Sequence, residues 1–410
     1  MSDEWSQAAA RIETYAEEMV QFQTEMVACP AIGPQNGGQG EADKARVVRE
    51  WLERLNPDQV LEVNAPDDRV PEGERPNLIG LFEGQSDARV WVLSHLDIVP
   101  PGERSLWDAD PFILRREGDR LIGRGVEDNQ QGLVASYFGM KAFRDEGLTP
   151  ALTVGLIFVA DEETGSHYGL RHILKTRGDL FSPRDLIIVP DAGAPDGTMI
   201  EVAEKSILVL KLTVTGKQCH ASTPHRGANT LRASARIITA VDEALHAEFN
   251  DTDELFSPPV STFEPTKKEA NVPNVNTIPG EDICYFDSRV LPHYDLNEIS
   301  LKARETAEQA AAESGVSVQL ETVKGPAPEP TPADAPVVEA LKRAVSVVHG
   351  REAGAMGIGG RTVAAYFREQ GLPAAVWSTA EGTAHSPNES CLIPNLIADA
   401  KVFAHLYQGL

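Results

Sequence analysis

Cysteine is scarce in this chain of 410 residues, and its four cysteines are widely separated: Cys29, Cys219, Cys284 and Cys391. No two have CxxC spacing, which argues against a structural zinc knuckle and against a disulfide framework. No apolar run approaches the ~20 residues that a membrane span requires, and the first residues lack the basic and apolar parts of a signal peptide. We therefore expect a cytoplasmic protein without a membrane partner.

Basic residues are also few. The chain has 37 Lys and Arg against 62 Asp and Glu, a formal net charge of −25 at pH 7. Binding to nucleic acid requires clustered positive charge, so we expect no nucleic-acid partner. Only 12 basic residues are lysines, and the acidic excess is spread along the chain. Because a carboxylate-rich surface stays hydrated where salt screens its repulsion, we expect a halophilic protein.

Apolar residues are plentiful enough for two structural units, since 41% of the chain is hydrophobic and a single domain usually has roughly 100–200 residues. The segment 3–28 has apolar residues at helical spacing and predicts one amphipathic helix. Three solidly apolar runs follow, separated by helical segments: Val90–Leu93, Leu152–Val159 and Leu186–Val189. Runs that are apolar on both faces predict an α/β domain with a helix-covered central sheet.

A different pattern begins at about Ile207, where alternating apolar residues predict a half-solvated strand. Helices are expected over 228–249 and 296–314, and strands over 283–290 and 316–323, which together form a compact α+β pattern. A proline-rich linker over 325–332 ends it. We therefore predict one domain from residues 1–206 and 326–410, with a second domain, residues 207–325, inserted into it.

Imidazole and carboxylate side chains follow the three apolar runs, where ligands bind in α/β sheets: His95 and Asp97, then Asp161, Glu162 and Glu163, then Asp191. Asp128 follows a glycine turn and His385 lies in a late loop. Each has an ordinary explanation alone, as a structural hydrogen-bonded pair, a helix N-cap or a solvated acidic turn. Together, imidazole and carboxylate ligands suit zinc, manganese or cobalt, and one shared carboxylate makes a two-metal hydrolytic site.

Nine ordered stretches carry a wider resemblance: Ser94–Pro100, Trp107 with Pro111–Phe112, Gly123–Gly125 with Asp128, Asp161–Gly165, Pro190–Asp191, Gly216 with His220–Ser222, Asn276 with Ile278–Pro279, Asp287 with Arg289, and His385–Ser386. In these stretches the sequence resembles the di-zinc metallohydrolase family of acetylornithine deacetylase, succinyl-diaminopimelate desuccinylase, aminoacylase and related metallo-carboxypeptidases and dipeptidases. The resemblance covers nearly the whole chain. It implies an α/β catalytic, metal-binding domain and an inserted α+β lid and dimerisation domain.

The resemblance also implies two divalent metal ions, zinc in the first place, with cobalt or manganese as alternatives. Their ligands are implied to be His95, Asp128 and Asp191 for one ion, and Asp128, Glu163 and His385 for the other. Asp128 would bridge the two ions and Asp97 would orient His95. Glu162 would be the general base, taking a proton from the metal-activated water and later passing one to the leaving amine.

Four further residues are implied to contact substrate. His220 would stabilise the tetrahedral oxyanion, in its own subunit or in the partner of a homodimer. Asn276 would bind the oxyanion and Arg289 the substrate carboxylate, although a structural salt bridge is the alternative for Arg289. The sequence departs from the family where Gln130–Gly132 replace a common Lys-Gly. The loop 357–362 lacks a frequent Ser-Asp, and its Arg361 is expected to be a second carboxylate contact.

The leading functional hypothesis is hydrolysis of the amide bond of an N-acyl amino acid, as in deacetylases and desuccinylases, because two candidate arginines favour an anionic substrate. A metallo-dipeptidase or carboxypeptidase is the enzymatic alternative, and it requires an acidic group to receive a free α-amine. A catalytically silent dimeric binding protein is the third hypothesis. The intact ligand set and Glu162 argue against it.

Overall fold

The computed structural model describes residues 3–410 and divides into two compact units. The first unit consists of the described residues up to Val202 with Pro330–Met356 and Thr362–Leu410. The second consists of Ala203–Glu329 and Gly357–Arg361. Residues 357–361, which the sequence-based boundaries place in the first domain, belong to the second unit, where the Gly357 N–H donates to the Leu255 carbonyl at 2.6 Å. The roles of catalytic domain and lid remain predictions.

The first unit is built on a large mixed sheet with the strand order β1-β4-β8-β5-β9-β18-β10-β17, of which only the last residues of β10 and β17 belong to the second unit. Its central strands β8, β5, β9 and β18 run parallel, with Val92 opposite both Leu156 and Ile188. Antiparallel pairs flank this group, β4 with β1 and β8 on one side and β10 with β18 on the other. The bounds are β1 (Gln59–Glu62), β4 (Leu78–Phe82), β5 (Arg89–His95), β8 (Thr153–Val159), β9 (Leu186–Val189), β10 (Met199–Glu204), β17 (Gly354–Ile358) and β18 (Ala374–Val376).

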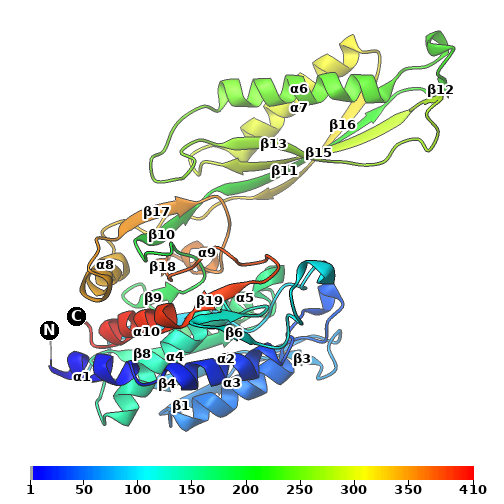
Figure 1. Cartoon of the computed structure of the whole chain (residues 1–410). Coiled ribbons are helices and arrows are strands. Elements are labelled where there is room, and N and C mark those ends of the chain that lie inside the picture. The colour runs from blue at the N-terminus through cyan, green and yellow to red at the C-terminus, as the bar shows by residue number, and fades with distance from the viewer. Residues whose placement is uncertain (1–2) are drawn as a thin grey trace. The chain divides into compact units, whose positions relative to one another are not determined.

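Helices cover both faces of this sheet, so the predicted α/β class is confirmed (Figure 1). Trp91, Ile157 and Ile187 face one side, where they pack in one cluster with residues of α5 and α9. Helix α4 contacts β5 and β8, and packs against α10. The helices are α1 (Asp3–Ile12), α2 (Ala16–Val27), α3 (Ala42–Arg54), α4 (Gln130–Asp145), α5 (Leu170–Arg177), α8 (Pro336–His349), α9 (Ala364–Glu369) and α10 (Ile393–Tyr407).

The prediction of one helix over residues 3–28 is wrong, because a turn separates α1 from α2. At that turn the Thr14 hydroxyl donates to the Arg11 carbonyl at 2.7 Å, and the Tyr15 N–H donates to the Ile12 carbonyl at 3.1 Å. Threonine side chains compete with helical hydrogen bonds in this way. None of the helices in the described part of the chain is long and apolar enough to cross a membrane.

The second unit contains an antiparallel sheet with the order β13-β15-β11-β16. Leu208, Leu210 and Leu212 alternate with more exposed residues along β11 and pack against Ile237 of α6 and Ile299 of α7. This is the expected α+β pattern, and both expected helices are present (Figure 1). The bounds are β11 (Ser206–Thr215), β12 (Cys219–His220), β13 (Thr262–Lys268), β14 (Thr277–Ile278), β15 (Glu281–Val290), β16 (Ser317–Gly325), α6 (Thr230–Glu248) and α7 (Leu296–Glu313).

Candidate metal centre

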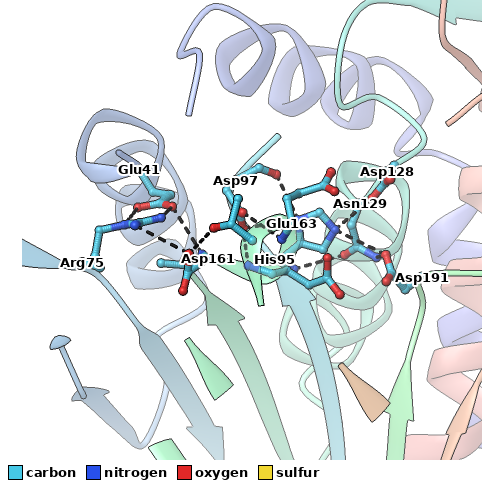
Figure 2. Close-up of polar contacts among 12 residues, drawn as sticks. Glu41, Arg75, His95, Asp97, Asp128, Asn129, Asp161, Glu163 and Asp191 are labelled. Carbon is cyan, nitrogen blue, oxygen red and sulfur yellow. Dashed lines mark hydrogen bonds and ion pairs between the residues drawn. The ribbon is translucent and has the colours of Figure 1, made fainter. Parts of the chain in front are cut away.

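The carboxyl edge of the parallel strands carries a dense group of polar side chains (Figure 2). Strand β5 ends at His95, β8 ends two residues before Asp161, and β9 ends two residues before Asp191. Parallel neighbours end at the same edge of a sheet, which is why these distant segments meet there. Asp128 joins the group from the turn that precedes α4.

His95 is held in one orientation by its backbone neighbours. Its Nδ1 lies 3.0 Å from the Asp97 carbonyl oxygen, and because a carbonyl can only accept, Nδ1 carries the proton. The opposite nitrogen, Nε2, lies 2.8 Å from Asp128 and 3.3 Å from Asp191. The Asp97 carboxylate lies 3.6 Å from Nδ1, so the acceptor that fixes the ring is the backbone carbonyl of Asp97 and not its side chain. This arrangement presents Nε2 as a metal ligand.

Asp128 lies between two imidazoles. Its Oδ1 contacts His95 Nε2 at 2.8 Å, and its Oδ2 lies 3.0 Å from His385 Nε2. His385 also lies 3.1 Å from a carboxylate oxygen of Glu163. One carboxylate that offers each oxygen to a different neighbour is the geometry required of a ligand that bridges two ions.

The donor atoms are close enough to hold metal. Ligand atoms of His95, Glu162 and Asp191 lie within 4.8 Å of one another, and so do those of His95, Asp128 and Glu163. The structure therefore brings together all the predicted ligands and the predicted base: His95, Asp128, Glu162, Glu163, Asp191 and His385. Imidazole nitrogens and carboxylate oxygens form a set that suits a borderline divalent ion such as zinc.

The electrostatics of this edge favour positive charge. Burial lowers the pKa of His95, but hydrogen bonds with Asp128 and Asp191 outweigh burial and raise that pKa well above its ordinary value. Hydrogen bonds with Asp128 and a second carboxylate raise the pKa of His385 to about 10. Burial and then the charge of Asp191 raise the pKa of Glu162 well above its ordinary value. Glu162 thus loses its proton less readily than an isolated glutamate, and divalent ions can balance the negative charge that causes this shift.

Asn129 is a site residue that the sequence analysis missed. Its Nδ2 donates to Asp191 Oδ1 at 2.9 Å and to the Pro190 carbonyl at 2.7 Å. Its Oδ1 accepts the His95 N–H at 3.3 Å. Asn129 thereby fixes two predicted ligands relative to each other. The available signal was its place directly after Asp128.

Two buried glutamates hold the loops that carry ligands, and both were missed. Glu389 accepts the N–H groups of Gly125, Glu127 and Asp128 at 2.9–3.0 Å. Glu127 in turn accepts the N–H groups of Gly382 at 3.0 Å and Thr383 at 2.5 Å, in the loop that carries His385. The one signal for Glu389 was an acidic residue four positions after His385.

The other four predicted residues lie in the second unit. Nδ1 of His220 accepts the Ser222 N–H at 3.1 Å, which leaves Nε2 free to donate. Asn276 accepts the N–H of Ala221 with its backbone carbonyl at 2.8 Å. Arg289 forms a two-point ion pair with Asp287, at 2.7 and 3.1 Å, and its third nitrogen donates to the Gly359 carbonyl at 3.1 Å. Nη1 of Arg361 donates to the carbonyl of Pro326 at 3.3 Å.

Comparisons with known sequences find relatives over nearly the whole chain. The family model described as peptidase family M20/M25/M40 matches residues 91–409. The chain is 36% identical over 408 residues to an uncharacterized metallohydrolase of Methanococcus maripaludis, covering 94% of this chain and 98% of that protein. It is 26% identical over 398 residues to a succinyl-diaminopimelate desuccinylase of Gluconobacter oxydans, covering 97% and 98%.

Solved structures share the fold. Human carnosine dipeptidase 1 superposes with a TM-score of 0.78 at 19% identity, covering 98% of each chain. The M20 family metallo-carboxypeptidase Sso-CP2 of Sulfolobus solfataricus superposes with a TM-score of 0.73 at 20% identity, covering 96% of this chain and all of that chain.

Proposed function

This chain belongs to peptidase family M20/M25/M40 and is a metallohydrolase that acts on carbon–nitrogen bonds, and from that premise we propose that it hydrolyses the amide bond of an N-acyl amino acid. The observation that carries the proposal is the position of Asp128 between His95 and His385, with Glu162 beside them. Similarity to desuccinylases over almost the whole chain favours an acylated amino acid as substrate.

We propose that two divalent ions occupy this edge, zinc in the first place and cobalt or manganese as alternatives. His95, Asp128 and Asp191 would hold one ion, and Asp128, Glu163 and His385 the other. Two such ions, when bound, polarise the amide carbonyl and lower the pKa of the attacking water. His95 is suited to this role because its Nδ1 proton is already committed to the Asp97 carbonyl.

In this proposal Glu162 moves the proton. It takes a proton from water as the oxygen–carbon bond forms, and passes it to the amide nitrogen as the carbon–nitrogen bond breaks. The Asp97 carboxylate accepts the N–H groups of Glu162 at 3.0 Å and Glu163 at 3.1 Å. Asp97 therefore supports both His95 and the backbone that carries the base.

The second unit would bind the substrate and stabilise charge. His220 accepts the Ser222 N–H at Nδ1, so Nε2–H is the donor available to an oxyanion. Asn276 would assist it, and Arg289 and Arg361 would bind anionic groups of the substrate. We further propose that this unit is the lid and the dimerisation surface of a homodimer, and that the protein works in high salt.

Metal content and amide hydrolysis, measured on one purified sample in high salt, test the proposal. The substrates are N-acetylornithine, N-succinyl-diaminopimelate and simple dipeptides, each assayed before and after chelation. We expect about two ions per chain and release of an amine from an acylated amino acid that stops on chelation. Activity on dipeptides alone would replace the proposal with a dipeptidase. Neither metal nor turnover would favour a silent binding protein.

A further inference from the structure

We propose that Glu41 and Arg75 form a positioning pair that holds the loop carrying Glu162 and Glu163. Neither residue touches the proposed reacting atoms, and both precede the region 91–409 that the family model matches. The expected effect on turnover rests on the proposed function. The expected effect on the loop does not.

Glu41 and Arg75 are joined in the interior of the first unit. Glu41 directly precedes helix α3, and Arg75 lies on the short strand β3 (Glu74–Arg75). Both side chains are fully buried and form a two-point ion pair, with Arg75 Nε donating to Glu41 at 2.6 Å. Burial and the two-point contact together fix the orientation of each side chain against the other, which suits a fixed support.

This pair contacts the residue directly before the proposed base. Glu41 accepts the Asp161 N–H at 3.3 Å, and Arg75 Nη1 lies 3.7 Å from the Asp161 carboxylate. Asp161 has φ +63°, the left-handed region that non-glycine residues rarely adopt. Such a conformation persists only where the surrounding contacts impose it. Glu41 and Arg75 supply two of these contacts, one to the backbone and one to the side chain (Figure 2).

Carboxylates hold three consecutive N–H groups of this loop. Glu41 binds the N–H of Asp161, and Asp97 binds those of Glu162 and Glu163. The backbone directions at 162 and 163 decide where the two side chains point. Without the hydrogen bond from the Asp161 N–H to Glu41, the loop would still be held by Asp97 and by the other hydrogen bonds of Asp161. We therefore expect the loop to be displaced while the protein stays folded.

The test replaces the pair by apolar residues of similar volume, Glu41→Leu with Arg75→Met, because such exchanges commonly preserve stability where single removals do not. Asp67, which also lies near Arg75, keeps its two-point ion pair with Arg69. The matched control is Glu201→Leu with Arg368→Met, another fully buried two-point pair. Arg75→Lys, which keeps the charge, is the conservative variant.

Two measurements are made on the full chain. Hydrogen exchange followed by mass spectrometry reports on residues 161–166, and steady-state kinetics with metal analysis reports on turnover. We expect the double variant to exchange at least tenfold faster in 161–166, with helix α4 unchanged, and kcat to fall at least tenfold with KM within twofold and metal content retained. Arg75→Lys should change both exchange and kcat less than the double variant does, and the control pair should leave exchange in 161–166 unchanged.

Unchanged exchange in 161–166 would overturn the proposal whatever the substrate proves to be. Faster exchange with unchanged kcat would also overturn it, because the loop would then move without consequence for turnover. If the double variant does not fold, the Arg75→Lys protein decides by the same two measurements. If the wild type hydrolyses none of the substrates, the proposed function fails, and the exchange data still test the support of the loop.

Discussion

Two histidines of the first unit lie in opposite surroundings. His385 is at the carboxyl edge of the sheet, where hydrogen bonds with Asp128 and Glu163 raise its pKa to about 10. His405 is on helix α10 and only 3% exposed, and burial followed by the positive charge of Arg343 lowers its pKa to about 4. The surroundings of His385 therefore stabilise the protonated imidazole, and those of His405 stabilise the neutral imidazole.

The carboxyl edge around His385 and the helix layer, meaning the packed helices around His405, differ in whether neighbouring groups compensate the charge of a protonated imidazole. Carboxylates at the edge outnumber the imidazoles that contact them, so positive charge stabilises it. Around His405 a T-shaped contact with Trp5 and buried apolar neighbours give no such compensation. The edge is therefore a candidate metal site, whereas the surroundings of His405 form a packed core that disfavours positive charge.

Removing the central carboxylate of the edge should have the largest effect. Asp128→Ala deletes the contacts to both His95 and His385, so we expect metal content to fall from two ions to at most one and kcat to fall at least a thousandfold, a loss of about 4 kcal/mol. Asp119→Ala, at an exposed position of the same unit, is the matched control. Full metal content in the Asp128 variant would remove Asp128 as the bridge.

Neutralising the proposed base should separate proton transfer from metal binding. Glu162→Gln keeps the size of the side chain but cannot accept a proton, so we expect at least a hundredfold lower kcat, a loss of about 3 kcal/mol, with metal content retained. Glu50→Gln on the exposed face of α3 is the control. Turnover equal to that of the wild type would refute Glu162 as the base.

Acid should lower the free energy of unfolding through His405 in the helix layer. The folded-state pKa of His405 is about 4, below the ordinary value near 6.5, so the unfolded chain binds more protons between these pH values. Stability is then lost as pH falls, by about 2 kcal/mol between pH 7 and pH 5. His405→Phe, compared with the wild type by urea unfolding in the presence of chelator, should lack that part of the acid loss. Equal losses in both proteins would contradict this account.

The sequence was informative where function depends on local order. His95, Asp161–Glu163 and Asp191 follow apolar strands, so the rule for carboxyl edges could place them together. Asn129, Glu389 and the Glu41–Arg75 pair could not be found this way. Glu389 binds N–H groups more than 260 positions earlier in the chain, and only the folded chain brings such partners together.

Local patterns also failed where side chains compete with backbone bonds. The apolar spacing over 3–28 continues through Thr14, so the periodicity predicts an unbroken helix. It gives no sign that the Thr14 hydroxyl competes for a backbone carbonyl at the end of α1. Arg289 shows a related gap. Its residue type suggests a partner for a carboxylate, but the sequence cannot distinguish a substrate carboxylate from that of Asp287, which the structure places 2.7 Å from Nε.

Arg289→Lys distinguishes those two roles and is the smallest of the expected effects. Lysine keeps the charge but loses the two-point fork, so a residue that binds the substrate carboxylate should show KM raised about tenfold, worth about 1.4 kcal/mol, with kcat nearly unchanged. Arg232→Lys, at an exposed position of α6, is the control. A residue that serves only Asp287 and Gly359 would instead leave KM unchanged and lower the unfolding temperature. Steady-state kinetics beside thermal unfolding on the same two variants therefore assigns Arg289 either to the substrate or to the second unit's own structure.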